Sequence, residues 1–155
     1  QQRSSQPSPT PMFSTQLSTA FGRTSGMAQA YRKIGIETSV DSASPHQLIS
    51  LLFDGYMDAL TQARGAMRLG QIEAKGKAIG RAARIIEEGL KSCLNLSEGG
   101  QLAQDLQALY DYLTTRLTLA NLRNDEALVD ECMRLVEPLR QAWRDIGHQV
   151  SAHKN

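Results

Sequence analysis

The segment from Ser42 to Tyr56 reads SASPHQLISLLFDGY and carries the pattern of a helix start followed by a broad apolar face. Ser44 is a favoured N-cap residue, and Pro45 fits the first helical position because its missing N–H would be unpaired there. Gln47 stands three residues after the cap, which completes a capping box. We therefore predict a helix from Pro45 to about Arg68.

The predicted helix is apolar around most of its circumference. Two stripes of apolar side chains run along it at steps of three or four residues: Leu48, Leu52, Tyr56, Leu60, Ala63 and Met67 in one, and Ile49, Phe53 and Met57 in the other. Such a helix either lies at the centre of a bundle or reserves one stripe for a partner. Apolar stripes at helical spacing are more often core than binding surface, and both interpretations stay open at this point.

Three further helical segments follow, separated by short turns. We predict helices over Ile72 to about Leu96, Gln101 to Arg123, and Glu126 to about Gln149. Pro138 lies inside the last one, and because an interior proline removes a hydrogen bond we expect a kink or break at 134–137. Short connections make consecutive helices antiparallel neighbours, and no alternating run typical of strands occurs. The predicted fold class is all-α: an antiparallel up-down four-helix bundle with a short N-terminal helical segment.

The first 26 residues differ in composition from the rest of the chain. They are rich in Pro, Ser and Thr and carry no acidic side chain, which disfavours a packed core. Met27 is a plausible start, so the expected domains are an N-terminal extension over 1–26, a helical bundle over 27–150 and a polar tail over 151–155. The extension still has apolar residues at roughly helical spacing, namely Met12, Phe13, Leu17 and Phe21. We expect these side chains to occupy a groove on the same or a neighbouring molecule.

Charge and cysteine content exclude several classes of protein. The chain of 155 residues has 17 Lys and Arg against 16 Asp and Glu, so no strong field steers it to nucleic acid or to a membrane surface. Cys93 and Cys132 lack CxxC spacing and fall on predicted apolar faces, which indicates buried thiols in a reducing cytoplasm. No apolar run of about 18 residues and no secretory signal pattern occurs.

The sequence lacks the common catalytic and cofactor-binding motifs. Di-metal carboxylate bundles need a Glu-x-x-His pair, and none of His46, His148 and His153 stands three residues after a Glu. Neither of the common glycine-rich phosphate-binding patterns is present. We therefore predict a protein that is not an enzyme and has no cofactor, with a metal-dependent bundle enzyme kept only as a formal rival.

Six short motifs stand out between residues 30 and 125. They are AY at 30–31, IETSV at 36–40, SASPHQLI at 42–49, LFDG at 52–55, LYDYL at 109–113 and ANLRND at 120–125. In this order and spacing they resemble the FliS family of flagellar export chaperones. The resemblance extends from about Met27 to Ile146.

The resemblance implies a cytoplasmic bundle that binds the disordered C-terminal segment of newly made flagellin. Such a chaperone would prevent premature polymerisation and keep flagellin competent for the flagellar type III export apparatus. The implied partners are flagellin, that apparatus, and an anti-sigma factor or another flagellar regulator. An apolar residue and a tyrosine near the N-terminus matter for the client in this family, and they fall here at Ala28 or Met27 and at Tyr31. A disordered client that folds into apolar grooves fits the surplus of apolar stripes.

We predict that three groups of residues bind the client. Tyr31, Ile34 and Ile36, with Ala28, would form a gate at the mouth of a groove. The groove would be lined by Leu48, Leu51, Leu52 and Tyr56 from the first helix and by Tyr110, Leu113 and Leu117 from the third. Asn121 and Asn124 would hydrogen-bond the client backbone. Which stripe faces the core stays open, and the alternative is a structural bundle that homodimerises; without client we expect a monomer or weak dimer.

Overall fold

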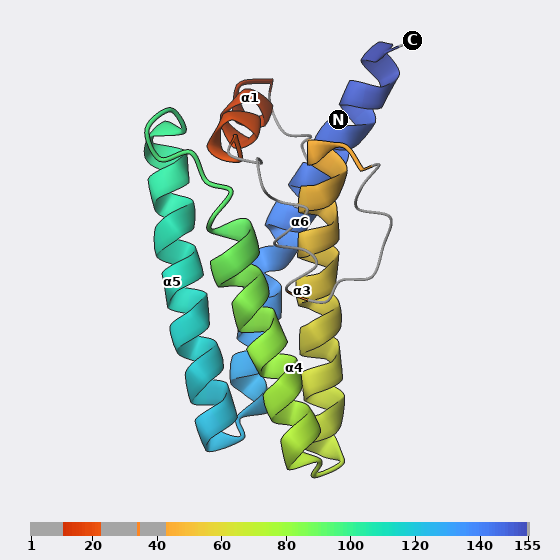
Figure 1. The fold of residues 1–155 in the computed structure, drawn as a ribbon, viewed down its shortest axis with the longest axis vertical. Helices are drawn as coiled ribbons and strands as arrows, with labels where there is room; N and C mark the ends of the chain where they lie inside the picture. Colours follow the sequence, from red (N-terminus) through yellow and green to blue (C-terminus); the bar gives the residue numbers. More distant parts are fainter. Residues whose placement is uncertain (1–10, 23–33, 35–42, 155) are drawn as a thin grey trace, which may run out of the picture.

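A computed structural model describes residues 11–22, 34 and 43–154, and the side chains of 13–22, 34 and 43–148. Its long helices are α3 (Pro45–Arg68), α4 (Ile72–Arg84), α5 (Gly100–Arg123) and α6 (Glu126–Lys154), and α4 continues as the π-helical segment η2 (Ile85–Leu90). They run alternately up and down and pack side by side (Figure 1). The described residues contain no strand, and the predicted all-α bundle is confirmed.

The start of α3 has the predicted geometry. Ser44 Oγ accepts a hydrogen bond from the Gln47 backbone N–H at 3.2 Å, and Gln47 Oε1 accepts one from the Ser44 N–H at 2.8 Å. Gly70, just after the helix, has a φ of 70°, a left-handed conformation that glycine adopts without strain. Local sequence alone therefore determines both ends of α3.

The second helix differs from the prediction of one regular helix to Leu96. The α-helical part ends at Arg84, and the chain then forms the wider π-helical turns of η2. Gly89 explains how close η2 lies to α3, because a Cβ atom there would be 2.7 Å from Leu52 Cδ2. A side chain at residue 89 would require Leu52 or the helices themselves to move.

The expected break in the last helix is absent. α6 runs as one helix from Glu126 to Lys154 with Pro138 inside it. Because proline has no N–H, Pro138 cannot donate the usual helical hydrogen bond to the Arg134 carbonyl. Both residues are exposed, so water can bind that carbonyl instead. Buried Val136 and Trp143 hold the helix against the core on either side.

The structure shows which of the two apolar stripes on α3 belong to the core. Leu48, Leu52, Tyr56 and Leu60 from one stripe and Ile49 and Phe53 from the other are all buried. α3 packs against α4 and η2 on one side and against α6 on the other. Most of its apolar circumference therefore belongs to the core.

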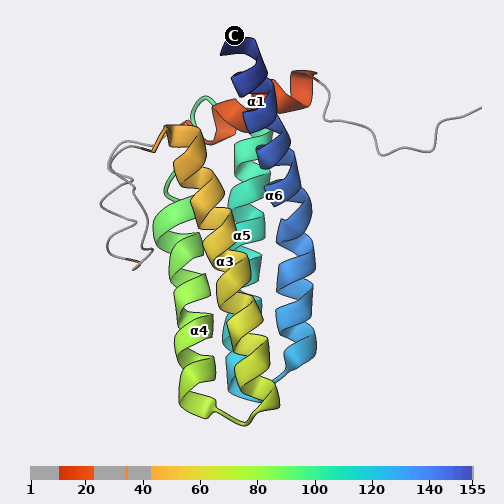
Figure 2. The same cartoon turned by 90° about the vertical axis from the view of Figure 1, so that its right-hand side faces the viewer.

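The N-terminal segment contributes a short helix, α1 (Pro11–Ala20), which lies across one end of the bundle (Figure 2). Leu17, Ala20 and Phe21 are buried against α5, α6 and the residues before α5. The predicted groove for these apolar residues is therefore on the same molecule. The side chain of Met12 lies outside the described residues.

Candidate functional site

The side chains predicted to bind a client do not form one surface. Leu52, Tyr56, Tyr110, Leu113 and Leu117 have no exposed area, and Ile34 and Leu48 are also buried. Leu51 is half-buried, whereas Asn121 and Asn124 are exposed at the end of the bundle opposite α1. Ala28, Tyr31 and Ile36 lie outside the described residues. In this conformation the predicted groove lining is mostly core.

Two tyrosines occupy the centre of that core in unlike ways. The Tyr56 hydroxyl donates to the Cys132 carbonyl at 3.1 Å, but the Tyr110 hydroxyl has no hydrogen-bond partner among the described residues. Burial raises the pKa of both phenols, and it raises the pKa of the Cys93 and Cys132 thiols to about 12. The interior is therefore uncharged, and its thiols stay protonated and poor as nucleophiles.

The seam between α3 and α6 is closed by polar contacts. Arg64 pairs with Asp130 at 2.9 Å, Arg140 pairs with Asp54 at 2.7 Å, and Arg68 pairs with Glu126. We call this row the α3–α6 seam.

At the α1 end of the α3–α6 seam, His46 stacks on Trp143 with a centroid distance of 4.7 Å. The His46 Nε2 lies 2.7 Å from the Trp143 carbonyl, and Trp143 Nε1 donates to the His46 carbonyl at 3.0 Å. The two helices are thus tied together along their shared length by three ion pairs and a ring stack.

The opposite side of α6, the α5–α6 seam, is built differently. Tyr112 donates a hydrogen bond to Glu131 Oε2 at 2.5 Å, and Arg116 Nε donates to Glu131 Oε1 at 3.0 Å. Arg116 also lies over the Tyr112 ring, 5.6 Å from its centroid. The hydrogen bond from Tyr112 is the main cause that lowers the pKa of Glu131, so the carboxylate stays charged and holds both neighbours in place.

Apolar side chains line the α5–α6 seam without being covered. Tyr112 is 43% exposed and Leu135 is 38% exposed. On α5, Leu109 lies three residues before Tyr112 and Leu119 seven residues after it, which places them on the same face. On α6, Leu139 lies one turn after Leu135. Leu109, Leu119 and Leu139 are half-buried. The motif LYDYL at 109–113 indicated this part of α5 as a binding region, but the sequence analysis chose Tyr110 and Leu113 from it as the client-binding residues. The signal that was missed is the adjacent stripe Leu109, Tyr112 and Leu119.

Comparison with known proteins identifies the family. The family described as "Flagellar protein FliS" matches residues 27–150. The chain belongs to the FliS family. "Flagellar secretion chaperone FliS" of Salmonella typhimurium is 44% identical over 123 residues, which cover 79% of this chain and 91% of the relative. "Flagellar secretion chaperone FliSB" of Pseudomonas aeruginosa is 44% identical over 118 residues, which cover 76% of this chain and 93% of the relative. "Flagellar secretion chaperone FliS" of Vibrio cholerae is 36% identical over 121 residues, which cover 78% of this chain and 88% of the relative.

Membership in the FliS family confirms the resemblance seen in the sequence motifs. The family is one of secretion chaperones and not of enzymes, as predicted. No helix within the described ranges is long and apolar enough to cross a membrane, and no group of His, Cys, Asp or Glu side chains there has the arrangement of a metal site. The helix α1 precedes the residues that the family match covers.

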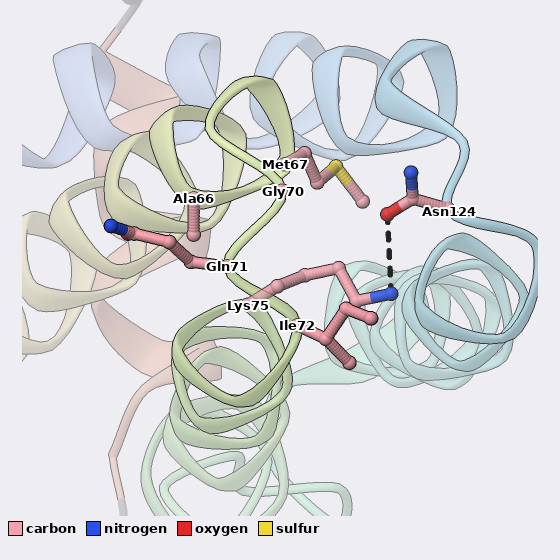
Figure 3. Close-up of a pocket in the computed structure, with 7 residues that line it drawn as sticks. All are labelled: Ala66, Met67, Gly70, Gln71, Ile72, Lys75 and Asn124. Carbon is pink, nitrogen blue, oxygen red and sulfur yellow. Dashed lines mark hydrogen bonds between the residues drawn. The ribbon is translucent and has the colours of Figure 1, made fainter.

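The end of this FliS bundle opposite α1 has a pocket of about 300 Å³ (Figure 3). Its wall includes Lys75, which is only 7% exposed. The Lys75 ammonium donates to the Asn121 carbonyl at 3.1 Å and to Asn124 Oδ1 at 3.2 Å. A cation at the C-terminal end of α5 offsets the negative end of the helix dipole, so Lys75 caps α5. Its burial is explained by the fold and requires no ligand.

Proposed function

We propose that this chain is a cytoplasmic flagellar secretion chaperone that binds the C-terminal segment of flagellin along the α5–α6 seam. The bound segment is kept from premature polymerisation and stays competent for the type III export apparatus. The observation that carries the proposal is the apolar stripe of Tyr112, Leu135, Leu109, Leu119 and Leu139, which runs along one seam of a bundle whose other α6 seam is closed by ion pairs.

The chemistry of the seam suits an amphipathic helix. Two neighbouring antiparallel helices with half-buried leucines form a shallow groove, and a client helix with apolar residues at three- and four-residue spacing can bury them there. A disordered segment must order as it binds, which consumes about 2–5 kcal/mol of the contact energy. The resulting moderate affinity suits a client that must later be released for export.

Tyr112 and Arg116 supply the anchors of the proposed groove. Tyrosine and arginine are the side chains that most often dominate the energy of protein interfaces. Here both are held by Glu131, so little side-chain freedom is left to lose when a client binds. Replacing Tyr112 by Ala should weaken flagellin binding about tenfold, with little change in melting temperature because Tyr112 is 43% exposed.

The residues predicted from the sequence keep a place in this proposal. Tyr31, Ile34 and Ile36, with Ala28, remain the residues that we propose as a gate at the mouth of the groove. Leu52, Tyr56, Tyr110, Leu113 and Leu117 support the groove from beneath, and Ile34 and Leu48 are buried with them. Leu51 is half-buried on α3. Asn121 and Asn124 are exposed at the end of α5, where their side chains can reach the backbone of a client that extends past the seam.

Size-exclusion chromatography of the full chain with and without a peptide of the flagellin C-terminal segment tests the proposal. A shift to a one-to-one complex is expected, starting from a monomer or weak dimer. Tyr31→Ala should reduce binding and leave the melting temperature unchanged. If that variant loses binding and stability in parallel, Tyr31 is a core residue. The type III export apparatus and an anti-sigma factor or other regulator are proposed as further partners of the complex.

A second candidate function is a structural bundle that homodimerises. It is favoured by three strongly exposed apolar side chains: Leu69 follows α3, Ile72 begins α4, and Leu122 lies in the last turn of α5. A stable dimer that ignores the flagellin peptide and dissociates in Leu122→Asp would support this function over the chaperone.

A further inference from the structure

The pocket at the end of the bundle opposite α1 contains an ammonium group that is not fully hydrogen-bonded. Lys75 is only 7% exposed, and its Nζ donates to the Asn121 carbonyl and to Asn124 Oδ1. An ammonium has three N–H donors, so the contacts that explain the burial of Lys75 account for two of them among the described residues. A charge this deeply buried gains most from a partner of opposite charge.

The walls of this pocket of about 300 Å³ offer donors and apolar atoms but no acid (Figure 3). Met67 and Ile72 contribute apolar side chains, and Gln71 and Asn124 contribute amides. Asn124 accepts from Lys75 with its oxygen, which leaves its amide nitrogen as a donor. None of the seven lining residues is acidic.

The start of α4 lies at the same pocket and lacks a side-chain cap. Gln71 is the N-cap residue of α4, and its side chain makes no capping hydrogen bond, in contrast with Ser44 on α3. The first N–H groups of α4, beginning at Ile72, therefore lack the acceptor that α3 has. Glu73 belongs to that first turn but does not line the pocket. The positive end of the α4 dipole adds to the charge of Lys75.

The two acids at the start of α6 are already bound. Asp125 Oδ1 accepts a hydrogen bond from the Ala127 N–H at 3.0 Å. Glu126 pairs with Arg68 in the α3–α6 seam. Arg123, in the last turn of α5, is exposed and adds a further positive charge at this end of the bundle. The ligand that complements the pocket is therefore an anion with an apolar part.

The α5–α6 seam ends next to this pocket. Leu119 is the last half-buried leucine of the seam on α5, and Asn124, five residues later, lines the pocket. Leu122 stands between them in the chain and is 78% exposed. A client helix that lies in the seam parallel to α5 therefore reaches the pocket with its C-terminal end.

We propose that this pocket binds the free C-terminal carboxylate of the flagellin segment, with an adjacent apolar side chain packed against Met67 and Ile72. This inference rests on the proposed function, because it names the part of the client that one end of the groove recognises. A chain end fits because every C-terminal segment carries this carboxylate, whatever its side chains are. The third N–H of Lys75 and the amide of Asn124 donate to its oxygens. Binding at this end also fixes the direction of the client helix.

Two forms of one peptide test the proposal: the flagellin C-terminal segment with a free carboxylate, and the same peptide with a C-terminal amide. Calorimetry on the full chain should show about tenfold weaker binding of the amide, because it lacks the charge that Lys75 binds. Amidation by itself favours a client helix, since a negative charge is unfavourable at a helix C-terminus. Weaker binding of the amide therefore reports the pocket and not the helicity of the peptide.

The free-acid peptide separates the two possible failures. Equal or tighter binding of the amide would overturn the carboxylate site while leaving the chaperone function intact. Failure of both peptides to bind would instead contradict the proposed function.

Gln71→Glu tests where on the chaperone the carboxylate binds. It places a negative charge at an exposed position on the rim of the pocket and removes neither hydrogen bond of Lys75. Binding of the free-acid peptide should fall about three- to tenfold, whereas binding of the amide should not change. Gln104→Glu makes the same substitution on the exposed surface near the α1 end of α5 and should affect neither peptide. Equal losses for both peptides in Gln71→Glu would overturn the proposal.

Lys75→Met removes the ammonium and keeps an unbranched apolar side chain. The difference in affinity between the free-acid peptide and the amide should disappear in this variant. Its melting temperature should also fall, because α5 loses the cation at its C-terminal end. Far-UV circular dichroism checks that the variant is folded. A tenfold difference that persists in folded Lys75→Met would overturn the proposal, and if the variant does not fold, Gln71→Glu still decides it.

Discussion

The two sides of α6 differ in the chemistry that joins them to the neighbouring helices. Toward α3, Arg140 and Arg64 reach carboxylates on the neighbouring helix, and the His46–Trp143 stack ties the α1 end. Toward α5, a single carboxylate, Glu131, orders a tyrosine and an arginine, and the leucines around them remain half-exposed. Ion pairs and a ring stack cross the polar seam, whereas the proposed client helix would cover the partly exposed leucines of the apolar seam.

The largest expected effect comes from a charge in the α5–α6 seam. Leu135→Asp should weaken binding of the flagellin peptide about 30-fold, equivalent to about 2 kcal/mol, since a buried carboxylate in the complex would lack a partner. The free chaperone should keep its melting temperature within a few degrees, because Leu135 is 38% exposed.

Asp54→Asn in the α3–α6 seam is the matched control for that charge. It removes a partner of Arg140 and should leave peptide affinity unchanged. Calorimetry on both variants decides the comparison. Equal losses of affinity in the two variants would mean that the client does not distinguish the seams.

Sequence reasoning reached the fold because its signals are local. Ser44 and Gln47 cap α3 through side chains three residues apart, and the left-handed turn at Gly70 depends on that residue alone. The consequence of Pro138 was misjudged because it depends on whether the Arg134 carbonyl faces water, which only the packed bundle determines.

The site was harder to predict from sequence than the fold. Tyr110 and Tyr112 belong to one motif and have the same chemistry, yet one is buried and the other 43% exposed. A rotation of α5 by part of a turn would exchange them. That rotation is set by contacts such as Tyr112 with Glu131, 19 residues away in the chain. The apolar pattern of the sequence therefore shows that a helix has an apolar face, but it does not decide which of two adjacent stripes is buried and which is exposed.

The closed seam can be broken by adding one methyl group. A Cβ atom at Gly147 would collide with the His46 ring, which must then leave its stack on Trp143. Gly147→Ala should lower the free energy of unfolding by about 1–2 kcal/mol through overpacking. Urea denaturation measures the change, and Ala at the exposed position Arg134 controls for a substitution elsewhere on α6. Because alanine is favoured over glycine inside a helix by about 0.5–1 kcal/mol, unchanged stability in Gly147→Ala would show that displacing His46 costs no more than that gain.

The two buried tyrosines allow a finer test of how the core supports the seams. Tyr56→Phe removes a hydroxyl that donates to the Cys132 carbonyl, so one buried hydrogen bond is lost and stability should fall by about 1 kcal/mol. Tyr110→Phe removes a buried hydroxyl with no partner among the described residues, and stability should stay equal or rise by up to about 1 kcal/mol. Denaturation midpoints at matched slopes compare them. A larger loss in Tyr110→Phe would reveal a buried water on that hydroxyl.

The smallest expected effect is the pH dependence of the α5–α6 seam. The hydrogen bond from Tyr112 lowers the pKa of Glu131 below its ordinary value, with further help from Arg116. A carboxyl group whose pKa is lower in the folded state stabilises the fold above its unfolded pKa, and this contribution is lost as pH falls through the folded pKa. Because Glu131 lies near the surface, the contribution should be at most about 0.5 kcal/mol.

Unfolding measured between neutral pH and the acidic range should therefore show a slightly steeper loss of stability in the unmodified chain than in Glu131→Gln. Glutamine cannot titrate, so that part of the slope disappears. Parallel curves would mean that the Tyr112–Glu131 hydrogen bond adds no net stability. The role of Glu131 would then be confined to holding Tyr112 and Arg116 in place for the client, and peptide affinity rather than stability would report it.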